Sequence, residues 1–453
     1  MSLFAPDQKW TPPPTPFGGF IDGKPAQTAP HVLVSGVSGA GKSRRVLGPG
    51  ILMWRGPVVA VSSKPDLIDM TLQQRADWGG AEHTYVLDLS GEVPNEVLPK
   101  GVRKVIVDPT ALIKTDDDAL DLATILMQAG TAGGGGGSGK GGDAFWETIS
   151  TAPLAAILRA ASDLAVGGMS GIDWARQAIS RQTNEEGDPV DHPSWETAIN
   201  YIKGSLLEQK LASAMGLDGK MRDSIAVTME SALAPWLRST VVGKPGDLAF
   251  TPALLEDPRA TLYIVAPATG VAAGAAVAAV DFVSKRWRAN QSEAVKLPRL
   301  LLVVDELTNT MPWPKLPTVV TESRAMGIHL LVAVQATQQF SKRYGREGME
   351  ELRSVFPATL ILVGAPEKEM LENAAWWSGK TEKVKSSVDH SQRQSMSTER
   401  VATLEAVDLL PRSIDQGRLL RGSRPGETGT INEAGLLVDL HDISQIAFKS
   451  RAT

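Results

Sequence analysis

Short apolar runs recur along this chain, and longer segments with helical spacing separate them. The runs with strand character are His31–Ser35, Val58–Val61, Thr84–Leu87, Lys104–Val107, Thr261–Ala266, Leu300–Val304, Leu330–Val334, Thr359–Val363 and Leu436–Leu440. Strands that alternate with helices form a mostly parallel sheet covered on both faces. The pattern therefore predicts a doubly wound α/β fold.

The texture of the sequence changes after residue 144. From Phe145 to about Leu237, β-branched runs are few, and Ala, Leu, Glu and Lys recur at helical spacing. This favours an inserted all-helical domain at residues 144–249. It would interrupt a nucleotide-binding domain with a first part at 31–143 and a second part at 250–453. Residues 1–30 are expected to be a flexible N-terminal tail, and the polar segment 380–400 a mobile loop.

Composition narrows the possible chemistry. The chain of 453 residues has no cysteine, which excludes disulfides, thiolate metal sites and thiol catalysis. Its six histidines are scattered, so a zinc site is not expected. The net charge of −5 means that any contact with nucleic acid needs a local basic surface. The uncharged stretch Ala260–Val280 is interrupted by Pro267 and Gly270, which favours a buried strand and helix over a transmembrane segment.

A phosphate-binding motif follows the first apolar run. Its residues are Gly36, Val37, Ser38, Gly39, Ala40, Gly41, Lys42 and Ser43, with a predicted helix from Lys42 to Leu47. The glycines let the backbone N–H groups face a polyphosphate, Lys42 would contact the β- and γ-phosphates, and Ser43 would bind Mg²⁺. Arg44 completes the predicted ATP-binding residues. A second match at Gly134–Lys140 has no preceding strand and reads as a glycine-rich linker.

A second nucleotide motif ends the run Leu301–Val304. Two carboxylates follow it, Asp305 and Glu306, in the Walker B form. A buried strand rarely ends in two acids without a role for them. We expect Asp305 to bind Mg²⁺ together with Ser43, and Glu306 to polarise the attacking water.

Two further polar residues are candidates for the same site. Gln335 ends the run Leu330–Val334, and in a parallel sheet it would lie at the carboxyl edge, where it could sense the γ-phosphate or position water. A polar strand end that bonds a loop is the alternative. Arg324 could reach phosphate in its own or a neighbouring subunit, or it could be an exposed helix arginine. Four other arginines could equally be an arginine finger, the residue that contacts the phosphates bound to a neighbouring subunit. They are Arg346, Arg353, Arg418 and Arg421.

Taken together, these motifs resemble those of conjugative coupling proteins, the TraG-like ATPases of type IV secretion within the FtsK–HerA class of ring motors. The resemblance rests on the strand and phosphate loop at 31–43, the strand and turn at 58–72, the aromatic entry Phe145-Trp146, the Walker B run at 301–306 and the third motif at 322–340. The segments at 360–380 and 410–421 extend it.

The resemblance implies a RecA-like P-loop NTPase that uses ATP and Mg²⁺ to pump DNA toward a secretion channel. It implies a homohexameric ring and contacts with a relaxase or channel proteins. The acidic residue that the family carries in the second segment is Ser62 or Ser63 here, and the family's membrane helices are missing. We therefore expect either a cytoplasmic member of the family or a soluble one that a separate membrane-anchoring subunit recruits to the inner face of the membrane.

Two other functions stay open from the sequence. An ATPase that unfolds or delivers a protein substrate fits the same motifs, and the acidic net charge is compatible with it. A docking module that uses nucleotide only to set its conformation fits the complete Walker motifs less well.

Overall fold

The computed structural model describes residues 16–133, 142–162, 171–243, 247–268, 272–291, 296–388, 394–421 and 435–446. The chain forms two compact units. Among the described residues, the first contains 16–53 and 330–446, and the second contains Trp54–His329. The glycine-rich linker predicted after Gly133, including the second match at Gly134–Lys140, lies outside the described residues.

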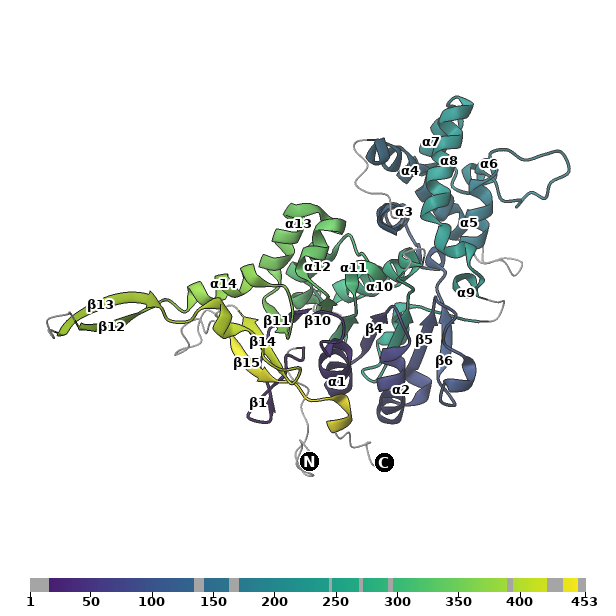
Figure 1. Cartoon of the computed structure of the whole chain (residues 1–453). Coiled ribbons are helices and arrows are strands. Elements are labelled where there is room, and N and C mark those ends of the chain that lie inside the picture. Colours follow the sequence, from purple (N-terminus) through teal and green to yellow (C-terminus); the bar gives the residue numbers. More distant parts are fainter. Residues whose placement is uncertain are drawn as a thin grey trace. The chain divides into compact units, whose positions relative to one another are not determined.

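The first unit carries a mixed sheet with the strand order β2-β1-β15-β14-β11-β3-β10; β1, β15, β14, β11 and β10 are labelled in Figure 1. Its strands are β1 (Phe20–Ile21), β2 (Lys24–Pro25), β3 (His31–Ser35), β10 (Ile328–Val334), β11 (Ala358–Leu362), β14 (Gln416–Arg421) and β15 (Leu436–Asp439). The middle strands β11, β3 and β10 are parallel, and β14 and β15 extend the sheet in antiparallel fashion. All residues of β3 and β10 are buried, as expected for apolar runs in a parallel sheet.

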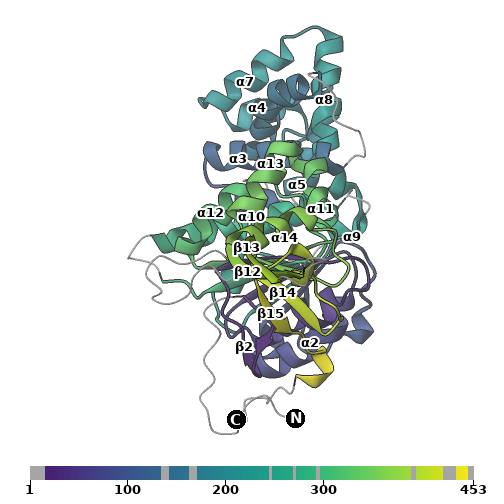
Figure 2. The same cartoon turned by 60° about the vertical axis from the view of Figure 1, so that its left-hand side comes forward.

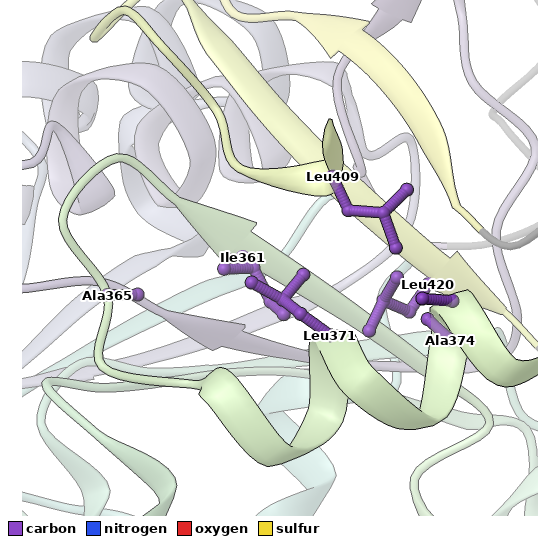
Figure 3. Packing of buried hydrophobic residues seen from close by; sticks show 7 residues of the cluster. Ile361, Ala365, Leu371, Ala374, Leu409 and Leu420 are labelled. Atoms are coloured by element: carbon purple, nitrogen blue, oxygen red, sulfur yellow. The ribbon is translucent and has the colours of Figure 1, made fainter. Parts of the chain in front are cut away.

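Helices connect these strands. They are η1 (Lys42–Leu47), α1 (Gly48–Met53), α13 (Ser341–Val355), which is kinked at Gly345, and α14 (Lys368–Trp377), with the short turns η8 (Thr337–Phe340), η9 (Ala406–Leu409) and η10 (Ile443–Gln445). The inner side of α14 packs Leu371 and Ala374 against Ile361, Leu409 and Leu420 (Figure 3). This apolar cluster fixes α14 on the sheet.

Two expectations for this unit were wrong. Residues 380–388 and 394–400, predicted to be part of a mobile loop, are strands instead: β12 (Lys380–Val388) and β13 (Gln394–Ala402) pair in antiparallel fashion and project away from α14 (Figure 1). Residues 18–29 are not part of a flexible tail, because β1 pairs with both β2 and β15, and Phe20 is buried. Both segments lack a long apolar run, so the sequence pattern had no signal for them.

The second unit carries a parallel sheet with the strand order β9-β4-β8-β5-β6-β7. Its strands are β4 (Val58–Ser62), β5 (Thr84–Asp88), β6 (Arg103–Ile106), β7 (Leu248–Ala249), β8 (Thr261–Val265) and β9 (Leu300–Val304). The helices next to these strands are α2 (Asp66–Gly79), α9 (Ser239–Val242), α10 (Ala273–Trp287), α11 (Leu307–Thr310) and α12 (Leu316–Met326), with the short turns η2 (Ala81–His83), η3 (Asn95–Val97), η4 (Pro109–Leu112), η5 (Ala234–Leu237), η6 (Pro252–Leu255) and η7 (Arg288–Gln291). The stretch from Ala260 is thus a buried strand followed by a helix, and no described helix is both long and apolar enough to cross a membrane.

The remaining helices of the second unit gather in a separate lobe (Figure 2). They are α3 (Asp116–Gly133), α4 (Gly142–Ser162), α5 (Gly171–Ile179), α6 (Trp195–Tyr201), α7 (Leu206–Met215) and α8 (Gly219–Ala232). Side-chain caps explain where several begin: Ser194, Ser205 and Asp218 each accept hydrogen bonds from the first turn. Trp195 and Trp236 are buried, and their indole N–H groups donate to Ile179 O and Val107 O, both at 3.1 Å.

Candidate functional site

The phosphate loop leaves the sheet at the end of β3. Gly36 N donates to Val334 O on the neighbouring strand at 3.2 Å, and the turn closes where Arg45 N donates to Gly41 O at 2.8 Å. Gly39 and Gly41 have φ angles of 80° and 87°. A Cβ atom on Gly41 would also lie 2.8 Å from Arg45 Cδ. These positions require glycine, and the resulting backbone turn is the kind that forms an anion-binding concavity.

Lys42 lies across this loop. Its side chain is buried, and Nζ donates to Gly36 O at 2.6 Å and to Val37 O at 3.2 Å. The ammonium group is therefore held over the turn that precedes it, and it can exchange these carbonyl partners for phosphate oxygens. Ser43 follows in the first turn of η1 and is partly exposed.

Arg44, also predicted to bind nucleotide, is engaged elsewhere in the first unit. Its Nε and Nη2 atoms lie 2.9 and 2.8 Å from the two carboxylate oxygens of Asp442. The side-chain hydrogen bond from Arg44 lowers the pKa of Asp442 well below its usual range, and Asp442 in turn raises the pKa of Arg44. Arg44 must leave this pair before it can contact a phosphate.

Gln335 stands next to the phosphate loop. Strand β10 runs parallel to β3 with Val334 opposite Ser35, so Gln335 begins at the level of Gly36. Its backbone N–H donates to Gln339 Oε1 at 3.2 Å. The structure thus brings Gln335 to the loop, while its role on phosphate or water stays a prediction.

The two carboxylates of the Walker B run follow β9 in the second unit. Asp305 is buried, its N–H donates to Val61 O at 2.8 Å, and its carbonyl accepts from Thr310 Oγ1 at 2.9 Å. Glu306 has φ and ψ of 50° and 50°, a left-handed conformation that costs a non-glycine residue about 1–2 kcal/mol. Strained backbone of this kind concentrates at functional sites.

Arg324 lies near the start of β9, whereas Asp305 and Glu306 follow the end of that strand. It is exposed on the last turn of α12, three residues before Gly327, whose carbonyl accepts from Leu300 N at the start of β9. The length of β9, about 16 Å at 3.3 Å per residue, therefore separates Arg324 from Asp305 within this unit. Arg324 forms no ion pair with any described residue, and it cannot serve Asp305 and Glu306 in cis.

The surroundings of Arg324 are positively charged. Buried His329 has its pKa lowered to about 4, by burial and then by the charges of Arg299 and Arg324. Arg299 is exposed directly before β9. Arg299 could not be predicted from the sequence, because a single basic residue before an apolar strand is too common to indicate a function.

Three of the other candidates for an arginine finger have bonding partners in the first unit. Arg346 pairs with Glu350 at 3.0 Å, and Arg418 donates to Leu409 O at 2.7 Å. Arg353 is mostly buried and bonded to Thr337 and Glu369. Reaching a neighbouring subunit would require each to give up these bonds.

The donor set suits Mg²⁺ bound largely through a nucleotide. No group of three or more histidines or carboxylates that could hold a metal occurs in the described part of the chain. Mg²⁺ usually keeps several waters and takes one or two protein oxygens together with substrate phosphates. Ser43 in the first unit and Asp305 in the second supply oxygens of the required type, and their joint role on Mg²⁺ stays a prediction.

The comparisons with known proteins point to one group. Residues 299–414 match the family model described as the TraM recognition site of TraD and TraG. The structure of the bacterial conjugative coupling protein TrwBdeltaN70 superposes with a TM-score of 0.64 at 17% identity, covering 96% of this chain and 90% of that one. The chain has the fold of a conjugative coupling protein. A comparison with curated protein sequences found no match.

Two nucleotide complexes of plasmid coupling protein TrwB match in the same way. The complex with the ATP analogue ADPNP gives a TM-score of 0.62 at 18% identity over 94% of this chain and 88% of that one. The complex with ADP and Mg²⁺ gives 0.61 at 18% over 96% and 90%. These matches confirm the predicted resemblance to coupling proteins and the predicted fold, a doubly wound, mostly parallel sheet with an inserted helical domain.

Proposed function

We propose that this chain is an ATP-hydrolysing motor of the coupling-protein type that pumps DNA or nucleoprotein toward a type IV secretion channel. The observation that carries the proposal is the phosphate loop, with Lys42 over its carbonyls and Gln335 beside it, in a fold shared with a protein that binds ADPNP and ADP with Mg²⁺.

Each residue has a distinct part in this proposal. The N–H groups of Gly36–Lys42 and the Lys42 ammonium bind the phosphates, and Arg44 joins them once released from Asp442. Ser43 and Asp305 hold Mg²⁺, which neutralises charge on the phosphates when bound. Glu306 accepts the proton of the attacking water, and Gln335 orients that water or reports the γ-phosphate.

We further propose that the motor works as a homohexameric ring in which Arg324 completes a neighbouring subunit's site. Support comes from the exposure of Arg324, its distance from Asp305 in its own subunit, and the basic surroundings formed with Arg299. The lumen of such a ring would contact DNA phosphates without reading bases. The matched segment at 299–414 favours relaxosome or channel proteins as partners. A separate membrane-anchoring subunit would hold such a ring at the inner face of the membrane.

The test is ATPase activity of the purified chain alone, with single-stranded DNA, with double-stranded DNA, and with an unfolded protein. Stimulation by DNA that declines as salt rises supports the proposed motor, because phosphate contacts release counterions. Stimulation by the protein alone favours the alternative, an ATPase that delivers or unfolds a protein substrate. No nucleotide hydrolysis under any condition contradicts both.

A further inference from the structure

A buried carboxylate outside the nucleotide motifs lies beneath the phosphate loop. Glu367 precedes α14, and only 1% of its surface is exposed. Its Oε1 accepts from Ser35 Oγ at 2.6 Å and from Thr337 N at 2.7 Å, and its Oε2 accepts from Thr337 Oγ1 at 2.7 Å. A carboxylate this deeply buried is tolerated only with such partners.

The partners of Glu367 belong to two segments that are distant in sequence. Ser35 is the last residue of β3, directly before the phosphate loop, and Thr337 lies two residues beyond Gln335. One side chain therefore bonds both segments that the proposed function assigns to the phosphates. The backbone bond from Gly36 N to Val334 O also links the two segments at this level.

The network continues to a surface helix. Arg353 on α13 donates from Nε to Thr337 Oγ1 at 2.7 Å, its Nη2 lies 3.7 Å from Glu367 Oε2, and its Nη1 donates to exposed Glu369 at 2.8 Å. Thr337 Oγ1 thus accepts from Arg353 and donates to Glu367. The bonds among Glu367, Thr337 and Arg353 share atoms in a buried or partly buried place, so the loss of one weakens the others, whereas the bond to Glu369 lies at the surface.

We infer that Glu367 is a positioning residue, which fixes the end of β10, and with it Gln335, against the phosphate loop in the arrangement needed for hydrolysis. The inference rests on the proposed ATPase function. It has a specific kinetic consequence. The phosphate loop keeps its own glycine turn and Lys42 without Glu367, so nucleotide binding survives, whereas turnover depends on where Gln335 is held.

The first test compares Glu367→Gln with the matched control Glu369→Gln. Both remove one acidic partner of Arg353, but only the first is buried and bonded to Ser35 and Thr337. The amide keeps the shape of Glu367 and loses one acceptor oxygen and the charge. We expect kcat to fall at least tenfold in Glu367→Gln, with Kd for ADPNP changed less than threefold, and no change in the control.

A second readout does not depend on turnover. Amide hydrogen exchange should become faster in residues 35–43 and 335–340 of Glu367→Gln, and stay as in the unmodified protein in Glu369→Gln. Ser35→Ala removes only the bond on the loop side, so it should reproduce part of the loss of kcat and add nothing in the double variant with Glu367→Gln. It also serves if Glu367→Gln does not fold.

The outcomes separate this inference from the proposed function. An unmodified chain with no ATPase activity contradicts the function, and faster exchange at both segments would still support the network. Wild-type kcat and exchange in Glu367→Gln, or equal losses in Glu369→Gln, overturn the inference. A loss of ADPNP affinity as large as the loss of kcat also overturns it, because that result indicates general damage to the unit.

Discussion

Arg44, in the first turn after the phosphate loop, and Asp442, near the end of the described chain, form a bidentate ion pair at 2.8 and 2.9 Å. The pair competes with the predicted role of Arg44 on nucleotide. Asp442→Asn weakens the competitor, so we expect it to raise ADPNP affinity a few-fold, while Arg44→Ala lowers it. Titrations with a fluorescent nucleotide check both. If neither change alters affinity, Arg44 has no part in binding.

The same pair makes a small contribution to stability with a defined pH dependence. The side chain of Arg44 is 56% exposed, so Arg44→Ala should cost less than about 1 kcal/mol at neutral pH. The folded pKa of Asp442 is lowered, so its contribution is fully present above the unfolded value of about 3.9, declines as the pH falls below that value, and is lost as the pH falls through the folded pKa. Urea unfolding at pH 7 and pH 3 should show the difference between variant and parent shrinking at the lower pH.

Lys42→Ala should abolish nucleotide binding at working concentrations. Hydrogen bonds from a charged group contribute about 1.5–3 kcal/mol each, which corresponds to a roughly 10- to 100-fold loss of affinity per contact. Lys368→Ala is the control, since Lys368 is exposed and pairs only with Glu372 at 3.5 Å among the contacts described. Isothermal titration with ADPNP measures both. Unchanged affinity in Lys42→Ala means that the loop does not bind phosphate.

Glu306→Gln should bind ATP normally and hydrolyse it about 10²–10⁴-fold more slowly, because the water loses its base. Asp305→Asn should instead weaken binding that depends on Mg²⁺. Measuring ADPNP affinity with and without Mg²⁺, next to ATPase rates, distinguishes the two carboxylates. Equal loss of binding in both variants contradicts the division of roles.

The left-handed backbone of Glu306 predicts that glycine at this position gives a more stable fold than alanine. Glycine adopts this conformation freely, so the free energy of unfolding of Glu306→Gly should exceed that of Glu306→Ala by about 1 kcal/mol. Glu306→Gly should therefore unfold at a higher urea concentration. Both variants lack the carboxylate and should be inactive. Equal stability of the two would mean that the conformation carries no strain.

The sequence predicted the strands and the phosphate loop because long apolar runs and a glycine-rich motif are local signals. Strand β9 and the helical turn η1 have the bounds that were expected, Leu300–Val304 and Lys42–Leu47. The hairpin β12–β13 was missed because both of its strands are polar. Glu367 was missed because its partners Ser35 and Thr337 are distant in sequence, although an acid shortly after the apolar run Leu360–Leu362 was a signal like that of Asp305.

The last prediction concerns assembly. If Arg324 completes a neighbour's site, ATPase activity per subunit must rise with protein concentration, because the contact is head-to-tail and closes only in a ring. Arg324→Ala should reduce kcat about 10³-fold or more and leave ADPNP affinity unchanged, since the arginine acts on charge that develops during hydrolysis. Arg288→Ala is the control, because Arg288 in η7 pairs at 2.8 Å with Glu322 on α12, the helix that carries Arg324. Mixing Arg324→Ala with Glu306→Gln decides the matter: each protein is inactive alone, but a mixed ring contains junctions where an intact Glu306 faces an intact Arg324. Recovery of activity in the mixture supports a shared site. No recovery, or turnover that is independent of concentration, contradicts it.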